Sequence, residues 1–208
     1  MPTAREALLN AALTALSGLP WSGIRMVDVA SAAGVSRQTL YNEFGSKDGL
    51  ARALVRREAD AYLHGVDRIL AERTGIAEQL VSLAEWTVGE ARARPLLRAL
   101  LTGAWSERLP APRPARPSVA GAAVPAQRRA DAGHPAPAEL VAAVRDRSLA
   151  VLGQVGVRRA EEEAVLLAHR CELAVRLALS CVVAPAPEGV GQLVRTALSA
   201  PGSRAAVR

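Results

Sequence analysis

The sequence predicts an all-α protein, and three observations support this fold class. Half of the 208 residues are hydrophobic but only 3% are aromatic, so the apolar mass is Ala, Leu and Val, which favours helices over sheets. Apolar residues recur at helical spacing between glycine and proline breakers along most of the chain. No segment shows the strict alternation of a half-buried strand. We therefore expect a core built from packed helices.

The first predicted helix covers residues 3–17, with Thr3 as its N-cap. Its apolar face consists of Ala7, Leu8, Ala11, Ala12 and Ala15. Gly18, Pro20 and Gly23 then break the helical pattern. The N-terminal segment has charged residues inside an amphipathic pattern and lacks the continuous apolar run of a signal peptide, so we expect a cytoplasmic protein.

Two short helices are predicted next, at about residues 25–33 and at residues 37–44. Residues 34–36 form a tight turn between them, and Ser36 can cap the second helix. Gly45 ends that helix, because glycine readily adopts the conformation of a helix C-terminus. A helix, a three-residue turn and a second helix form the geometry that lets the second helix enter the major groove of DNA.

The remaining helices follow from the same patterns. They are predicted at about residues 47–73, 75–93, 95–106, 138–155, 158–183 and 190–199. Ser46 can cap the first of these, and Pro95 suits the first turn of the third. Residues 107–138 are rich in Pro, Ala and Arg and have almost no periodic apolar face, which predicts an extended or disordered loop.

The helix at residues 37–44 has one apolar and one polar face. At about 100° per residue, Leu40 and Phe44 point toward the core. The side chains that can reach base edges from the outward face are Arg37, Gln38, Thr39 and Asn42. Gln and Asn suit adenine, Arg suits guanine, and Thr can reach a base or a methyl group. We therefore expect these four residues to read DNA bases.

Lys47 is the only lysine of the chain and lies in the first turn of a predicted helix. A cation there opposes the helix dipole, but beside a phosphate the ammonium and the backbone N–H groups bind the same anion. The alternative is a solvated surface lysine. The chain carries a net charge of +6, yet basic and acidic residues cancel within residues 1–48. DNA binding would therefore depend on placed contacts rather than on overall attraction.

The stretch "RMVDVASAAGVSRQTLYNEFGSKDGL" resembles the DNA-binding module of the tetracycline-repressor (TetR) family. The matching elements are Asp28-Val29-Ala30, Ala33-Gly34-Val35-Ser36, Thr39-Leu40-Tyr41, Phe44 and Ser46-Lys47-Asp48. The resemblance covers about residues 5–50. It implies a DNA-binding domain at residues 1–46, a helical effector-binding and dimerisation domain at residues 47–208, and repression that a small molecule relieves.

Carried over by position, the resemblance implies roles for single residues. Arg37, Gln38, Thr39 and Asn42 would face the bases, as inferred above from the helical wheel. Tyr41 and Lys47 would hold phosphates. Arg25 stands where the family often has a serine or threonine that contacts a phosphate. Arginine can still reach a phosphate, although it is not an N-cap residue.

The last two predicted helices suggest a homodimer. The helix at residues 158–183 is apolar on nearly all sides, so it must be covered from several directions. With the apolar stripe of residues 190–199, it could form a four-helix interface between two copies. The alternative is that both helices are buried within one monomer. A two-fold dimer on double-stranded DNA would read a near-palindromic operator.

An effector pocket is expected among the helices of residues 47–106 and 158–183. Candidate residues for its wall and its polar groups are Tyr62, His64, Leu83, Trp86, Leu100, Leu101, Trp105 and His169. The apolar composition suggests a small hydrophobic effector, such as a fatty-acyl, alkane-like or aromatic compound. The alternative for each apolar residue is ordinary core packing, since cores are apolar as well.

Catalysis, cofactors and metals are not indicated by the sequence. His169 and Cys171 are two residues apart, so they face different sides of a helix. Cys171 and Cys181 are expected to be buried free thiols, and no stretch approaches the length of a membrane span. We therefore expect no enzyme activity and no membrane partner. The alternative function is a helical small-molecule binding or sequestering protein with a vestigial DNA-binding module.

Overall fold

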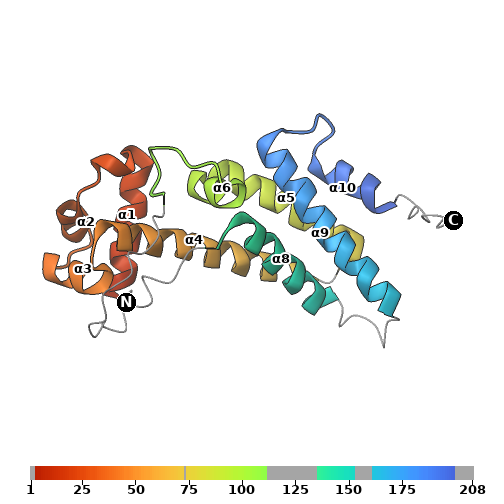
Figure 1. Ribbon diagram of the computed structural model, residues 1–208, viewed down its shortest axis with the longest axis horizontal. Helices are drawn as coiled ribbons and strands as arrows, with labels where there is room; N and C mark the ends of the chain where they lie inside the picture. Colours follow the sequence, from red (N-terminus) through yellow and green to blue (C-terminus); the bar gives the residue numbers. More distant parts are fainter. Residues whose placement is uncertain (1–2, 73, 112–134, 153–160, 200–208) are drawn as a thin grey trace. The chain divides into compact units, whose positions relative to one another are not determined.

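The computed structural model describes residues 3–72, 74–111, 135–152 and 161–199. Within these ranges the structure contains nine α-helices, one short 3-10 turn at Trp21–Gly23 and no strand, which confirms the all-α class. The helices are α1 (Ala4–Gly18), α2 (Met26–Ala32), α3 (Arg37–Phe44), α4 (Lys47–Leu70), α5 (Ile76–Ala93), α6 (Pro95–Thr102), α8 (Pro137–Leu152), α9 (Glu161–Val183) and α10 (Val190–Ser199) (Figure 1).

The chain divides into two compact units. The first combines Met1–Ala61 with Pro95–Ala136, and the second combines Tyr62–Arg94 with Pro137–Arg208. Helix α4 contributes residues to both units. These units follow packing, so the functional boundary expected after residue 46 stays a prediction.

The ends of α1 and α3 are fixed by the capping residues that the sequence indicated. Thr3 forms a capping box with Glu6, in which each side chain accepts a hydrogen bond from the other residue's backbone N–H. The Ser36 hydroxyl accepts a hydrogen bond from the backbone N–H of Thr39 at 3.0 Å. Gly45 follows Phe44 with φ of 68°, a conformation that favours glycine. The bounds predicted for α3 are confirmed.

Two predicted helices are shorter than expected. Helix α6 ends at Thr102 instead of residue 106, because Gly103 adopts a φ of 73° and leaves the helical conformation. Helix α4 ends at Leu70 instead of residue 73. There the side-chain amide of Gln79 donates to the carbonyls of Leu70 at 2.9 Å and Glu72 at 2.6 Å. Most of the loop predicted at residues 107–138, and the predicted helical residues 153–155 and 158–160, lie outside the described residues.

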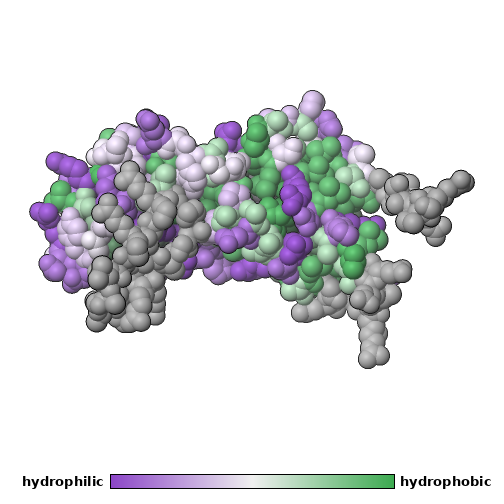
Figure 2. Space-filling model, in the orientation of Figure 1, coloured by the Kyte–Doolittle hydropathy of each residue, from purple (hydrophilic) through white to green (hydrophobic). Residues whose placement is uncertain are grey.

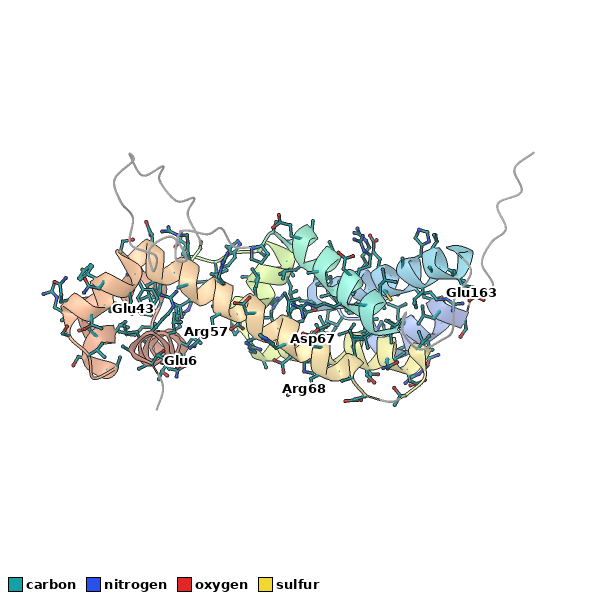
Figure 3. All side chains as sticks on the ribbon, turned by 90° about the horizontal axis from the view of Figure 1, so that it is seen from below. Glu6, Glu43, Arg57, Asp67, Arg68 and Glu163 are labelled. Carbon is teal, nitrogen blue, oxygen red and sulfur yellow. The ribbon has the colours of Figure 1, made fainter. Side chains whose placement is uncertain are left out.

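In the first unit, α1, α2 and α3 pack around a small apolar core. Helix α1 packs against α2 and α3, and the inward side chains Leu8, Val29 and Leu40 are buried. Figure 3 shows Glu43 on α3, with Glu6 and Arg57 on α1 and α4 of the same unit. These contacts give the short α3 a fixed position that its own eight residues could not maintain in isolation.

The connection from α3 to α4 leaves no room for a side chain at Gly49. A Cβ built on Gly49 would overlap the backbone carbonyl oxygen of Phe44. The Ser46 hydroxyl accepts a hydrogen bond from the Gly49 N–H at 3.0 Å, which confirms Ser46 as the cap of α4. The start of α4 is therefore packed directly on the last turn of α3.

The second unit is a helical bundle in which α5 packs against α9 and α10, and α8 packs against α9 (Figure 1). Tyr62 and Trp86 stack with 5.5 Å between their ring centroids and 7° between their planes. Gly65 permits this arrangement, because a Cβ there would overlap the indole of Trp86. Asp67 forms an ion pair with Arg147 of α8. These contacts hold the end of α4 within the bundle.

Candidate nucleic-acid interface

Helix α3 presents a polar outer face on an apolar base. Leu40 and Phe44 are 0% and 2% exposed, whereas the side chains of Arg37, Gln38 and Asn42 are exposed. The predicted split of the helix into an inward and an outward face is therefore confirmed. The outer face has the composition that base-edge recognition needs, with one guanidinium and two amides.

The two outward amides are not independent of each other. Gln38 Nε2 donates a hydrogen bond to Asn42 Oδ1 at 2.9 Å along the exposed face. Residues four apart lie on the same side of a helix, which brings the two side chains together. In this arrangement Gln38 is the donor and Asn42 the acceptor.

Thr39 lies closer to the turn than the other candidate base-reading residues. Its side chain is half-buried, and its hydroxyl lies 2.9 Å from the hydroxyl of Ser36. Tyr41 lies on the same helix and is 39% exposed. A base-reading role for Thr39 and a phosphate-binding role for Tyr41 stay predictions, with Tyr41 the more accessible of the two.

Arg25 occupies the N-cap position of α2, and its side chain makes no capping hydrogen bond. It instead binds Asp28 with two hydrogen bonds, of 2.8 Å from Nε and 3.1 Å from an amino group. The hydrogen bond to Asp28 raises the pKa of the Arg25 guanidinium. A phosphate contact by Arg25 would therefore have to compete with the Asp28 carboxylate, and this role stays a prediction.

Lys47 opens α4 as expected, but its ammonium group already has neighbours. Lys47 Nζ donates to the carbonyl oxygen of Ser22 at 3.3 Å and lies 5.1 Å from the ring centroid of Trp21. Partial burial lowers the pKa of Lys47, while the charge of Asp48 acts in the opposite direction. The turn at residues 21–23 thus holds the ammonium beside the N-terminus of α4.

Trp21 contacts Lys47, although nothing in the sequence singled it out. It precedes Lys47 by 26 positions, so no local spacing connects the two. Its backbone N–H donates to the carbonyl of Arg108 at 2.9 Å, which ties the turn to the segment after α6. Trp105 lines the same groove as Trp21 and Lys47, which has a volume of about 520 Å³.

The residues expected at an effector site are distributed over both units. Tyr62, Leu83, Leu100 and Leu101 are buried, Trp86 and Trp105 are half-buried, and His64 and His169 are exposed. The structure brings Tyr62 and Trp86 into contact, and the Tyr62 hydroxyl lies 3.2 Å from that of Thr87. Burial raises the pKa of Tyr62 to about 12. Because His64 and His169 are exposed, they do not line an enclosed site with the buried Tyr62.

A pocket that sequence analysis did not predict lies between α5, α9 and α10. It has a volume of about 340 Å³. It is lined by Ile76, Ala77, Leu80, Glu163, Leu166, Leu167, Arg170 and Leu198. Apolar residues of three helices converge there, which local periodicity cannot show. Neither this pocket nor the groove beside Lys47 contains Tyr62, Leu83 or Trp86.

Helix α9 carries an exposed apolar surface. Its exposed large apolar residues are Val165, Leu166, Leu173 and Val183. Figure 2 shows hydrophobic residues gathered over this part of the second unit. The apolar pattern predicted on nearly all sides of this helix is therefore present, with one side covered by α5, α8 and α10 and another exposed.

Cys171 and Cys181 are buried free thiols, as expected. Burial raises the pKa of Cys171 to about 11. Among the described residues, no three His, Cys, Asp or Glu side chains are grouped as a metal site would require. None of the helices in the described ranges combines the length and apolarity needed to cross a bilayer.

Known proteins resemble this chain in sequence over part of its length. The sequence profile of the family described as "Bacterial regulatory proteins, tetR family" matches residues 8–54. The HTH-type transcriptional regulator AlkX of Mycobacterium tuberculosis is 41% identical over 100 residues, covering 48% of this chain and 47% of that protein. The nucleoid occlusion factor SlmA of Marinobacter nauticus is 29% identical over 102 residues, covering 49% and 52%. The chain thus matches about half the length of these curated relatives.

The fold has known counterparts over nearly the whole chain. The crystal structure of the TetR family repressor AlkX from Dietzia sp. covers 94% of this chain and 91% of its own, with a TM-score of 0.54 and 24% identity. At that identity the likeness shows a shared fold. The profile match spans most of α1, all of α2 and α3 and the start of α4, and so includes Ser36, Ser46 and the polar outer face of α3. Residues 8–54 therefore belong to the tetR family of bacterial regulatory proteins.

Proposed function

We propose that this protein is a dimeric transcriptional regulator that represses its targets and leaves a near-palindromic operator when it binds a small hydrophobic effector. The observation that carries the proposal is the outer face of α3, where Arg37, Gln38 and Asn42 are exposed above the buried Leu40 and Phe44. Side chains of these types recognise base edges in the major groove. Such a regulator acts on cytoplasmic DNA.

The phosphate contacts would come from the edges of the same unit. Lys47 and the first N–H groups of α4 offer a positive charge and donors at one place. Tyr41 offers an exposed hydroxyl, and Arg25 contributes if a phosphate displaces Asp28. Thr39 would add a contact near the turn. Because residues 1–48 have no net charge, these few contacts would supply most of the affinity.

The dimer would form through α9 and α10. The exposed Leu166, Leu173 and Val183 give α9 an apolar surface that a second copy could cover. Two α3 helices about 34–36 Å apart would then read half-sites one helical turn apart. This arrangement requires an operator with two-fold sequence symmetry.

The effector would bind an apolar site in the helical part outside α1, α2 and α3. The proposed contacts remain those expected from the sequence, and those in the second unit are Tyr62, His64, Leu83, Trp86 and His169. The hydroxyls of Tyr62 and Thr87 offer polar atoms within an apolar wall. The Dietzia repressor of similar fold is described as implicated in biodegradation of n-alkanes, which supports an apolar effector here.

Release from DNA would follow from the continuity of α4. The helix runs from Lys47, in the proposed DNA interface, through Tyr62, in the proposed effector site. An effector that binds one orientation of α4 more tightly would shift the dimer toward that geometry and change the spacing of the two α3 helices. The effector therefore need not touch DNA.

The test is selection of binding sites from a library of random DNA duplexes, followed by affinity measurements on the enriched sequence. The double variant Gln38→Ala, Asn42→Ala is expected to lose preference for that sequence. The matched control is Thr14→Ala, Ser17→Ala, which removes two exposed hydroxyls from α1 of the same unit. A double variant as selective as the parent would refute the reading face. A parent that enriches no sequence would favour the sequestering function instead.

A further inference from the structure

We infer that Asn42 is a positioning residue for Gln38, and that Gln38, so oriented, reads an adenine in each half-site. The inference rests on the proposed DNA-binding function and assigns different roles to the two amides. The juxtaposition behind it is the hydrogen bond from Gln38 Nε2 to Asn42 Oδ1, 2.9 Å long, on the exposed face of α3.

The hydrogen bond determines which atoms of Gln38 remain available. A planar amide has one N–H hydrogen on the side of its oxygen and one on the far side. When the far hydrogen is donated to Asn42, the oxygen Oε1 and the near hydrogen form an adjacent acceptor and donor. Adenine presents the complementary pair in the major groove, with N6 as donor and N7 as acceptor. Gln38 can therefore bind adenine with two hydrogen bonds while it keeps its contact to Asn42.

The same orientation disfavours guanine. Guanine presents two acceptors, O6 and N7, so the Oε1 of Gln38 would face another acceptor. A glutamine free to turn its amide over could offer its NH₂ group to O6 and avoid this conflict. With Asn42 in its observed orientation, that turn would bring Oε1 toward the Oδ1 of Asn42, so both amides would have to turn together. In the observed arrangement the contact between the two side chains thus favours adenine over guanine.

Asn42 itself is less suited to be the adenine reader. Its Oδ1 already accepts from Gln38, so the atoms it presents outward are mainly the hydrogens of its NH₂ group. These can donate to a base or a phosphate and add affinity. They do not distinguish adenine from guanine at the base that Gln38 contacts, since both purines have N7 as an acceptor.

Thr39 is a poor candidate for orienting Gln38. Its hydroxyl lies 2.9 Å from that of Ser36, at the other side of the helix start. Among the contacts that the structure gives for Gln38, the hydrogen bond to Asn42 is the one that involves another side chain of the outer face. The orientation of the Gln38 amide is therefore assigned to Asn42.

The experiment uses the full-length protein and the duplex that it enriches from a random library. Each base pair of the half-site is replaced in turn, and the position read by Gln38 is the one at which Gln38→Ala abolishes the preference. The parent is expected to prefer A·T over G·C there by about tenfold or more, the range of a good two-bond contact. Thr14→Ala on α1 is expected to keep the parental preference.

Two substitutions of Asn42 separate orientation from direct contact. Asn42→Ala removes the acceptor for Gln38, so the preference for A·T over G·C is expected to fall at least threefold. Asn42→Asp keeps an oxygen at the position of Oδ1 that can accept from Gln38 Nε2, and it replaces the NH₂ donors with a second oxygen. Its added negative charge is expected to weaken binding to all duplexes alike, while the A·T preference stays within twofold of the parent.

The outcomes are distinct. An Asn42→Ala variant that keeps the parental preference, or an Asn42→Asp variant that loses it as Asn42→Ala does, would overturn the positioning role. A base pair other than A·T at the position sensed by Gln38→Ala would overturn the assignment of adenine. A parent that enriches no sequence would overturn the proposed function and this inference together.

Discussion

The guanidinium of Arg5 lies over the ring of Phe44, with 4.7 Å between its central carbon and the ring centroid. The same group donates to the backbone carbonyl of Glu43 at 3.3 Å and pairs with the Glu43 carboxylate at 3.4 Å. Carbonyls in the last turn of a helix lack partners within the helix. Arg5 thus ties α1 to the end of α3 through three contacts.

Arg5→Ala is expected to destabilise the first unit by about 1–2 kcal/mol, since it removes a cation–π contact and hydrogen bonds that are partly shielded from water. Hydrogen exchange of the α1 and α3 amides, measured with urea, reports the stability of this unit. Arg5→Lys, which keeps the charge without the planar fork, is expected to lie between the parent and Arg5→Ala. Equal protection in all three proteins would contradict a stabilising role for Arg5.

Gly65→Ala is expected to lower the free energy of unfolding by about 1–3 kcal/mol, because its Cβ would displace Trp86 from its stack on Tyr62. Gly89→Ala is the matched control. It is also helical, and nothing lies within 4 Å of its Cβ position. That change is expected to be neutral or stabilising by up to about 1 kcal/mol. Urea unfolding of both variants distinguishes steric overlap from helix propensity, and a neutral Gly65→Ala would contradict the described packing.

Stability at alkaline pH is expected to depend on Tyr62. Burial raises the pKa of this phenol from 10.0 to about 12, so the unfolded chain loses its proton first as the pH rises. The stabilising contribution is complete below pH 10 and is lost as the pH rises through about 12. The slope would reach at most about 1.4 kcal/mol per pH unit.

Tyr62→Phe should flatten this decline. It should also cost about 0.5–1.5 kcal/mol at neutral pH, because the hydrogen bond to Thr87 is lost. Tyr41→Phe, which removes an exposed hydroxyl, should change neutral stability by less than about 0.5 kcal/mol. Unfolding in urea at a series of pH values provides the measurement. An unchanged alkaline decline in Tyr62→Phe would show that another group causes it.

Lys47→Ala is expected to weaken operator binding and to reduce the dependence of log affinity on log salt by about 0.9, the change for one lost phosphate contact. Lys47→Arg, which keeps the charge, should leave that dependence unchanged. Titrations at several salt concentrations provide the comparison. If Lys47→Ala keeps the parental dependence, the ammonium remains with Trp21 and Ser22 when DNA is bound.

Leu173→Glu is expected to convert the proposed dimer to a monomer, because it places a charge within the exposed apolar surface of α9. Leu19→Glu is the control, since Leu19 is 52% exposed and lies in the first unit. Analytical ultracentrifugation of both variants gives the oligomeric state. A dimeric Leu173→Glu would exclude this part of α9 from the interface.

The helix ends that the sequence predicted well are those fixed by neighbouring residues. Ser36 and Gly45 lie on either side of α3, and Thr3 with Glu6 opens α1. The end of α4 depends instead on Gln79, which reaches the carbonyls of Leu70 and Glu72 from the next helix. Gly65 lies within α4 without ending it. Its lack of a Cβ leaves space for the indole of Trp86. Tertiary contacts of this kind leave no periodic signal.

In the candidate interface, too, some features follow from local sequence and others depend on tertiary contacts. The faces of α3 follow from helical geometry, so Leu40 and Phe44 could be placed inside and Gln38 and Asn42 outside. The contact of Lys47 with Trp21 joins two different elements and could not be read from spacing. The pairing of Arg25 with Asp28 is a separation of three within one turn, and that signal was available in the sequence.

The missing side chain at Gly49 has a consequence for redesign and for evolutionary change. Any larger residue there would force the last turn of α3 away from the start of α4, since the Phe44 carbonyl occupies the space. If α3 reads DNA as proposed, a change of its preference would come from exchanging outward side chains on an unchanged backbone. A transplant of α3 into another protein would have to carry residues 45–49 with it as one piece.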